Sequence, residues 1–160
     1  MKPARASAQK GKRAPQSNAR LAAVQALYQM ELSGASSASV VEDMLAGRLP
    51  ADEKGPLDGD IDQDLFRKLI NGAVDYQQTI DTAIARALSE GWRLERIDAV
   101  ARAILRAGVV ELMTPGSAPA AAVINEYVEI AKSFFEGPEP GFVNAALDAC
   151  ARHAERGSDG

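Results

Sequence analysis

The residues best suited to catalysis or metal binding are the single cysteine, Cys150, and the single histidine, His153. A thiolate or an imidazole can act as nucleophile, base or metal ligand only when further groups converge on the same point. One cysteine cannot form a disulfide within a chain, and one Cys/His pair cannot assemble a metal cage. We therefore predict that Cys150 is a small packed apolar group and that His153 lies on the surface of the last helix.

Three aspartates, Asp60, Asp62 and Asp64, alternate along the chain as the first ligands of a calcium loop do. The glycine and the distal bidentate glutamate of such a loop are missing at the required spacing, so we predict that these carboxylates stabilise the start of a helix instead. The sequence also lacks a glycine-rich dinucleotide motif after a strand, a P-loop, an H-E-x-x-H motif and a nucleophile elbow. These patterns predict a binding module without catalytic residues, metal ligands or cofactors.

Basic charge is concentrated at the N-terminus. Residues 1–20 carry six basic side chains and no acid, whereas the rest of the chain carries 12 basic and 22 acidic side chains, so the formal net charge is −4. Such an arm can gain affinity for a polyanion by displacing condensed counterions, even in an acidic protein. A solvated tail that aids solubility is an equally good interpretation of the charge alone.

A proline-glycine segment at 137–141 interrupts two apolar helical stretches. The second helix must begin with unpaired backbone N–H groups, which favour an anion. Phe142 could stack on an unpaired base there, and Asn144 offers both donor and acceptor groups. Alternatively, Phe142 anchors the core and Asn144 bonds to the preceding loop.

The elements that position these residues are predicted to be helices, because apolar residues recur at three- to five-residue intervals and no segment alternates with period two for long enough to be a strand. The fold class is therefore all-α. We expect helical segments at 19–32, 37–47, 61–88, 97–113, 123–135 and 141–152.

Capping residues and glycines set the expected boundaries of these helices. Ser17 or Asn18 is the predicted N-cap of the first helix, which Gly34 ends, and Asp98 is the predicted N-cap of the helix with the clearest apolar stripe. The segment 61–88 is one bent helix or two, with Gly72 as the weak point and Gly91 as the terminator.

The domain organisation follows from composition. Residues 1–16 contain almost no large apolar side chain and are predicted to be a disordered basic arm, residues 17–156 a single helical domain, and residues 157–160 a flexible tail. No apolar run approaches a membrane span and no signal peptide precedes the domain, so we expect a cytoplasmic protein that does not contact a membrane.

Four segments in this order and spacing resemble the bacterial NusB family: "ARLAAVQALYQ", "RAILRAGVVEL", "VINEYVEIAKSF" and "GFVNAALD". The resemblance extends from Ser17 to about Arg152. It implies about seven helices in two packed helical bundles and a non-enzymatic role in transcription antitermination. Proteins of this family bind the boxA element of nascent ribosomal RNA, a single-stranded RNA, together with NusE, a small-subunit ribosomal protein, and the complex helps RNA polymerase to resist premature termination.

The resemblance assigns two regions to RNA binding. One is the arm with the first helix, and the other is the family's F-V-N-G element, which corresponds here to residues 142–145. The RNA-binding residues implied in this way are Lys10, Lys12, Arg13, Arg20, Gln25, Phe142 and Asn144.

The resemblance also implies a partner surface for NusE that includes Tyr28, Arg102 and Arg106. This chain departs from the family pattern there, because Ala101 stands where an acid is common. In the RNA-binding element, Ala145 replaces a glycine and adds a Cβ where the backbone would approach RNA. Val110 replaces an aromatic residue and Tyr127 a small one, which we interpret as compensating core volumes.

Two other functions fit the residues. One is an RNA-binding module related to the N-terminal domain of ribosomal RNA cytosine methyltransferases, which resembles the NusB fold. The other is a helical scaffold that binds only protein and whose basic arm is a solubility tail. Salt dependence distinguishes the scaffold from an RNA binder, because phosphate contacts weaken steeply as salt rises.

Overall fold

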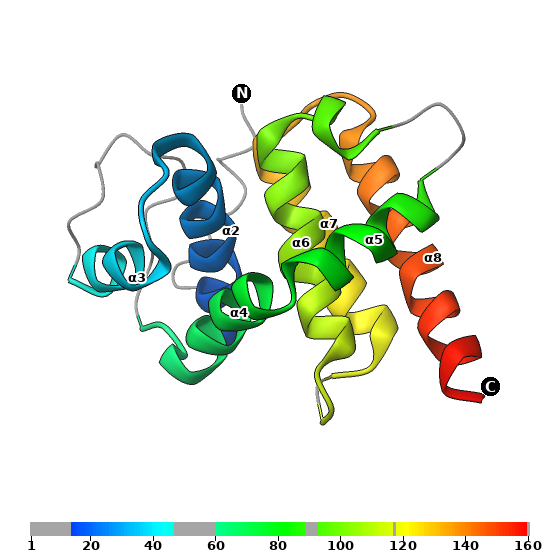
Figure 1. Ribbon diagram of the computed structural model, residues 1–160, viewed down its shortest axis with the longest axis horizontal. Coiled ribbons are helices and arrows are strands. Elements are labelled where there is room, and N and C mark those ends of the chain that lie inside the picture. The colour runs from blue at the N-terminus through cyan, green and yellow to red at the C-terminus, as the bar shows by residue number, and fades with distance from the viewer. Residues whose placement is uncertain (1–13, 47–59, 89–92, 117, 160) are drawn as a thin grey trace.

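The computed structural model describes residues 14–46, 60–88, 93–116 and 118–159. Within these ranges the chain forms seven α-helices and one 3-10 turn, and no strand occurs among them. Figure 1 shows α2, α3 and α4 gathered at one end of the molecule and α5, α6, α7 and α8 at the other. The all-α prediction and the arrangement in two helical groups are confirmed.

Helix α2 (Pro15–Ser33) begins two residues before its predicted N-cap. Ala14 occupies the N-cap position without a side-chain hydrogen bond, and Pro15 begins the helix, where its fixed φ is suited to the first turn. The prediction of Ser17 or Asn18 as N-cap is therefore wrong. The C-terminal prediction is confirmed, because Gly34 has φ 75° and donates its N–H to the Met30 carbonyl oxygen.

The next helices are α3 (Ser37–Leu45), α4 (Gln63–Asp75) and α5 (Gln77–Ala87). Asp62 caps α4 by accepting a hydrogen bond from the Leu65 N–H at 3.0 Å, which confirms a helix-start role for this carboxylate. The segment 61–88 is two helices, but they meet at Tyr76 and not at Gly72. The predicted terminator, Gly91, lies outside the described residues.

Gly72 lies within α4, and α6 from the other group packs directly on it. A Cβ at this position would lie 2.6 Å from Cγ1 of Val110, far inside van der Waals contact. The absence of a side chain therefore allows α4 to approach α6 closely.

A 3-10 turn (Leu94–Arg96) precedes α6 (Ala99–Met113), α7 (Ala120–Phe134) and α8 (Glu139–Asp159). Asp98 caps α6, as predicted, by accepting from the N–H of Val100 at 2.8 Å. Helix α8 begins two residues before the predicted start at Gly141 and extends beyond Arg152.

Helix α6 occupies the centre of the fold and contacts α2, α4, α5, α7 and α8. The largest fully buried side chains come from both helical groups and form one continuous core; they include Phe66, Leu69, Ile70, Ile84, Ile104, Leu105, Tyr127 and Leu147. No helix among the described residues is long and apolar enough to cross a membrane.

Candidate functional site

The start of α2 is held by a buried ion pair. Arg20 is 8% exposed, and its Nε and Nη2 donate to the two carboxylate oxygens of Glu111 at 2.8 and 2.7 Å. Glu111, 2% exposed, also accepts a 2.8 Å hydrogen bond from the Tyr127 hydroxyl. A two-pronged contact of this kind fixes the guanidinium in one orientation.

The contacts within this cluster shift the pKa values of Arg20 and Tyr127. The hydrogen bond to Glu111 raises the pKa of Arg20, so this side chain stays charged at any accessible pH. Burial, followed by the charge of Glu111, raises the pKa of the Tyr127 phenol well above its ordinary value. The guanidinium of Arg20 is already paired inside the protein, so the predicted contact of Arg20 with RNA would compete with its contact to Glu111.

Two further contacts anchor the first turn of α2. Ser17 donates to a carboxylate oxygen of Glu126 at 3.0 Å, and Asn18 donates through Nδ2 to the Asp60 carbonyl oxygen at 2.9 Å. The chain therefore has a fixed position at the point where the N-terminal arm joins the domain. Lys10, Lys12 and Arg13 of that arm lie outside the described residues.

The remaining predicted residues of α2 lie further along the helix. Gln25 is half-buried, and Tyr28 is half-buried against the hydrophobic core. Since Tyr28 belongs in part to the core packing, only a portion of its ring is available to a partner.

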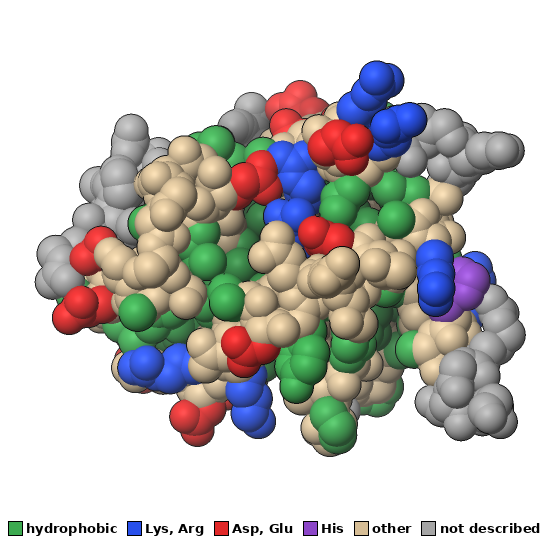
Figure 2. Space-filling model, in the orientation of Figure 1, with side chains coloured by type: hydrophobic (Ala, Val, Ile, Leu, Met, Phe, Trp, Pro, Cys, Tyr) green, Lys and Arg blue, Asp and Glu red, His purple; other side chains and the backbone are tan. Residues whose placement is uncertain are grey.

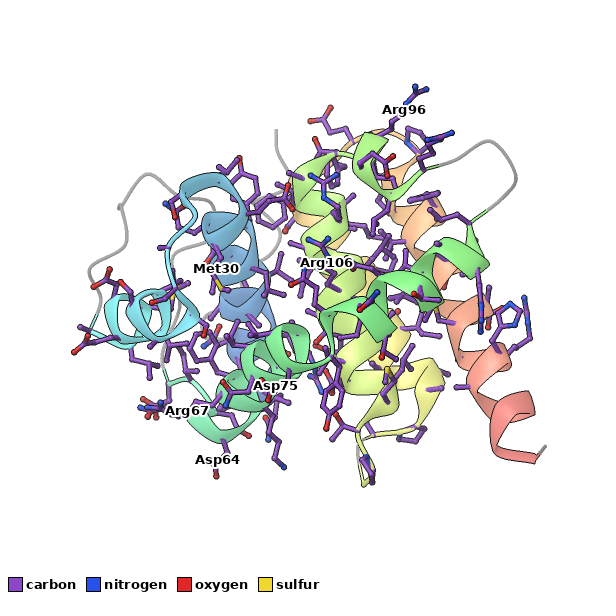
Figure 3. All side chains as sticks on the ribbon, viewed as in Figure 1. Met30, Asp64, Arg67, Asp75, Arg96 and Arg106 are labelled. Carbon is purple, nitrogen blue, oxygen red and sulfur yellow. The ribbon has the colours of Figure 1, made fainter. Side chains whose placement is uncertain are left out.

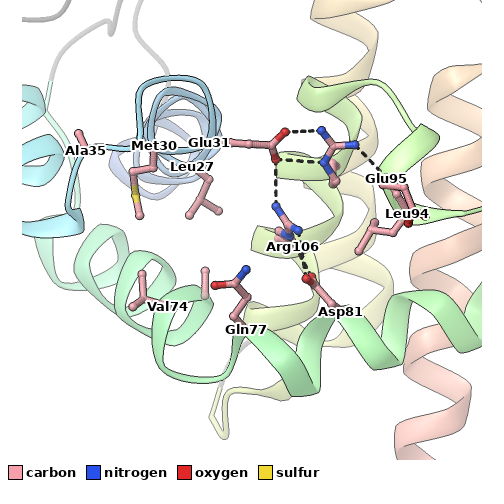
Figure 4. Close-up of a pocket in the computed structure, with 13 residues that line it drawn as sticks. Leu27, Met30, Glu31, Ala35, Val74, Gln77, Asp81, Leu94, Glu95 and Arg106 are labelled. Carbon is pink, nitrogen blue, oxygen red and sulfur yellow. Dashed lines mark hydrogen bonds and ion pairs between the residues drawn. The ribbon is translucent and has the colours of Figure 1, made fainter.

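Arg102 and Arg106 pair directly with two carboxylates, Glu31 and Asp81, and all four side chains line a pocket between the helical groups (Figure 4). Nε of Arg102 donates to Glu31 at 3.0 Å, and its Nη1 donates to the carbonyl oxygens of Leu94 and Ile97 at 3.0 and 2.6 Å. The hydrogen bond from Arg102 lowers the pKa of Glu31 below its ordinary value, and the reciprocal contact raises the pKa of Arg102.

Arg106 extends this ion-pair network to α5. Its Nε and Nη2 donate to the two oxygens of Asp81 at 2.9 and 3.0 Å, and its Nη1 donates to Glu31 at 3.1 Å. Figure 3 shows Arg106 on α6 and Met30 on α2. The two arginines thus join α2, α5 and α6, and neither presents an unpaired charge to a partner.

The pocket beside this network has a volume of about 550 Å³ and a mixed lining. Leu27, Met30, Ala73 and Val74 supply its apolar wall. Val74 is 41% exposed, which is unusual for an apolar side chain of its size in this molecule. On the face shown in Figure 2, basic and acidic side chains lie close together over the region between the two groups, with apolar side chains beside them.

Sequence reasoning did not identify the acidic halves of these networks. Glu31 and Asp81 are 71 and 25 residues from their arginine partners, and Glu111 is 91 residues from Arg20. Helical periodicity reports only neighbours three or four positions apart. No local signal in the sequence could therefore have paired them.

The second predicted RNA-binding region lies at the start of α8. Val143 is fully buried, Phe142 is half-buried against the core, and Asn144 is exposed. Because successive helical residues are about 100° apart, Phe142 and Asn144 lie on opposite flanks of the buried face of α8. The expectation that Phe142 anchors the core is met in part. Within the described residues, Asn144 makes no hydrogen bond to the preceding loop.

Four residues that depart from the family pattern have clear positions. Ala101 is 1% exposed, so the Cβ at this site faces the core, while Ala145 is exposed. Val110 packs on Gly72, whereas Tyr127 passes within 3.5 Å of the position a Cβ would take at Gly108. Val110 and Tyr127 thus fill different parts of the core, and the interpretation as compensating volumes has no support in the packing.

The two residues with catalytic potential, Cys150 and His153, both lie on α8. Cys150 is buried, which raises the pKa of its thiol to about 11, and its sulfur lies 3.6 Å from the Ala83 carbonyl oxygen. His153 is exposed on α8. The described part of the chain contains no cluster of His, Cys, Asp and Glu side chains that could hold a metal ion.

Residues 17–152 match the model of the NusB family. A transcription antitermination protein NusB from Caulobacter vibrioides is 56% identical over 140 residues, a match that covers 88% of this chain and 94% of the relative. The corresponding protein from Mesorhizobium japonicum is 46% identical and is matched over 93% of its length.

Solved structures agree with the sequence relatives. A structure of NusB from T. maritima superposes with a TM-score of 0.71 at 30% identity, covering 88% of this chain and 92% of that one. A crystal structure of the antitermination factors NusB and NusE in complex with double-stranded RNA contains a chain with a TM-score of 0.70 at 25% identity, covering 86% of this chain and 96% of that one.

Proposed function

The chain belongs to the NusB family, and on that premise we propose that it binds a boxA-type single-stranded RNA together with NusE and supports processive transcription. The observation that carries this proposal is the family match over residues 17–152, with relatives named as antitermination proteins at 46–56% identity. Those relatives are matched over 93–94% of their own length, which leaves no room in them for the catalytic domain of a methyltransferase.

For the RNA surface, we infer a role for the basic arm and for the start of α8. The arm, with Lys10, Lys12 and Arg13, supplies the salt-dependent part of the affinity. Gln25, Phe142 and Asn144 supply contacts to bases, because a half-buried aromatic ring suits stacking and the amides of the half-buried Gln25 and the exposed Asn144 suit edge recognition. Arg20 acts indirectly, by holding the first turn of α2 through Glu111.

For NusE, we infer that it contacts the pocket between the helical groups. Arg102 and Arg106 position the wall of this pocket through Glu31 and Asp81, and the exposed apolar surface at Val74 offers contact area. Tyr28 lies on the same helix as Glu31 and is placed beside this surface in our proposal.

The test is the affinity of the full chain for a boxA-type RNA, with and without NusE, at two salt concentrations and beside a scrambled RNA. We expect tight, salt-sensitive and sequence-selective binding that NusE strengthens. Binding to NusE with indifference to RNA sequence would instead support the protein-only scaffold.

Deletion of residues 1–13 isolates the contribution of the arm and leaves the start of α2 intact. This segment carries five basic side chains. Since each phosphate contact on a single strand contributes roughly 0.7 to the slope of log affinity against log salt, the slope should flatten by up to about 3.5. Equal slopes for the two proteins would mean that the arm does not contact phosphate.

A further inference from the structure

A second hollow lies between α7 and α8, and we call it the α7–α8 groove. It has a volume of about 440 Å³ and is lined by two stripes of residues that face one another. Asn125, Val128 and Lys132 of α7 follow the spacing i, i+3, i+7, and Gly141, Asn144 and Asp148 of α8 follow the same spacing. Residues at these intervals share one helix face, so the groove runs along both helices for roughly 10 Å, about three base spacings.

The floor of the groove is apolar and the walls carry amides. Ile124, 7% exposed, and the half-buried Val128 form part of the floor. Asn125 and Asn144 stand on opposite helices, both exposed, and within the described residues neither carboxamide makes a hydrogen bond. Each carboxamide can donate and accept, which is the pattern that the edge of a nucleobase requires.

The charges around the groove favour a base over a phosphate at its centre. Lys132 pairs with Glu129 at 3.1 Å, and both side chains are more than half exposed, so this pair is weak and Lys132 can move to a phosphate at the rim. Asp148 pairs with Arg152 along α8. The groove therefore has no excess of positive charge to attract a phosphate inward, and its amides are suited to reading sequence.

We propose that the α7–α8 groove is a base-reading subsite for single-stranded RNA. One unpaired base lies on the floor formed by Ile124 and Val128, and the carboxamides of Asn125 and Asn144 bind its edge. This assignment rests on the proposed function, because it takes the RNA to be the ligand. It adds α7 to an RNA surface that the sequence placed only on the arm, α2 and the start of α8.

Three variants of the full chain test the subsite. Asn125→Ala and Asn144→Ala each remove a carboxamide from an exposed helical position. Gly141→Ala adds a methyl group to the groove wall, where a Cβ meets no atom within 4 Å, so the fold accepts it. Asn71→Ala is the matched control, because Asn71 is also an exposed helical asparagine but lies on α4, away from the groove.

The assay measures the affinity of each protein, with NusE present, for a boxA-type RNA and for a set of the same RNA with one base removed at each position in turn. We expect each asparagine variant to bind roughly 3- to 10-fold more weakly, with an unchanged salt slope. One base-free position should weaken wild-type binding but have little further effect on the Asn125→Ala and Asn144→Ala variants. Gly141→Ala should bind more weakly without losing thermal stability, and Asn71→Ala should match the wild type.

Two outcomes would overturn the assignment, and they differ in cause. If the wild type binds no RNA with or without NusE, the proposed function fails and the subsite fails with it. If the wild type binds RNA and the groove variants match Asn71→Ala on every RNA, only the subsite is wrong.

Discussion

Replacing Arg20 by methionine tests whether this residue holds the fold or contacts RNA. Methionine replaces the aliphatic part of the arginine side chain but lacks the guanidinium, which binds both oxygens of Glu111 at 2.8 and 2.7 Å. The side chains of Arg20 and Glu111 are only 10% and 3% exposed, so water cannot replace the lost contact. Glu111 would keep the Tyr127 hydroxyl as a donor, which does not compensate a full negative charge.

Breaking a buried ion pair from one side costs about 3–5 kcal/mol, because the remaining charge stays buried without compensation. For a chain of this length, such a loss lowers Tm by about 6–20 °C. Thermal and urea unfolding followed by circular dichroism would measure it. Arg67→Met is the control, because Arg67 projects outward from α4 (Figure 3) and is exposed.

The double variant Arg20→Met, Glu111→Gln separates the charge from the packing. A neutral amide at position 111 removes the uncompensated charge, so most of the lost stability should return. If Arg20→Met instead loses less than about 1 kcal/mol and RNA affinity falls sharply in the folded protein, the buried ion pair is not its main role and the original prediction of RNA contact is correct.

Four further changes follow from single contacts. Gly72→Ala should destabilise the protein by about 1–3 kcal/mol in urea unfolding, because the new methyl group would lie 2.6 Å from Val110. Adding Val110→Ala in the same chain should restore part of the lost stability. An unchanged urea midpoint for Gly72→Ala would contradict the close packing of α6 on α4. The raised pKa of Tyr127 means that its contribution to stability is present below its ordinary pKa of 10.0 and is lost as pH rises towards the folded value, so Tyr127→Phe should flatten the alkaline limb of the stability profile. The lowered pKa of Glu31 has the opposite effect on stability. The contribution of Glu31 to the free energy of unfolding is present above about pH 4.5 and is lost as pH falls through the folded pKa. Glu31→Gln should therefore flatten the acid limb of the stability profile, and parallel acid limbs for the two proteins would count against the ion-pair network. Phe142→Ala should weaken RNA binding and also lower Tm, because the ring is half-buried; normal RNA binding by the folded variant would make Phe142 a core residue only.

The helices of this fold could be predicted well because the signals for a helix lie within a few residues of one another in the sequence. Apolar spacing located each described helix, and the caps at Asp98 and Gly34 were correct since a cap acts within a few residues. The errors came where distant contacts decided the outcome. Gly72 looked like a helix breaker, yet Val110 of α6 requires a glycine at that place.

The contacts of the candidate site residues could not be predicted for the same reason. The residue type of Arg20 suggested phosphate contact, but the structure pairs its guanidinium with Glu111, which lies 91 residues away. The α7–α8 groove depends on two stripes becoming neighbours, and the spacing within each helix says nothing about which stripes meet. Residue type thus indicated the chemistry that was available, and tertiary packing showed which residues lie together.

The contacts that anchor α2 also determine when its first turn can be fixed during protein synthesis. The first turn of this helix is among the earliest parts of the domain to leave the ribosome, but Glu111 and Glu126, which hold it, follow it by 91 and 109 residues. A nascent chain cannot fix the root of the basic arm until α6 and α7 have been synthesised. Chains that end before α6 therefore carry the basic arm without the two carboxylates that hold the first turn of α2.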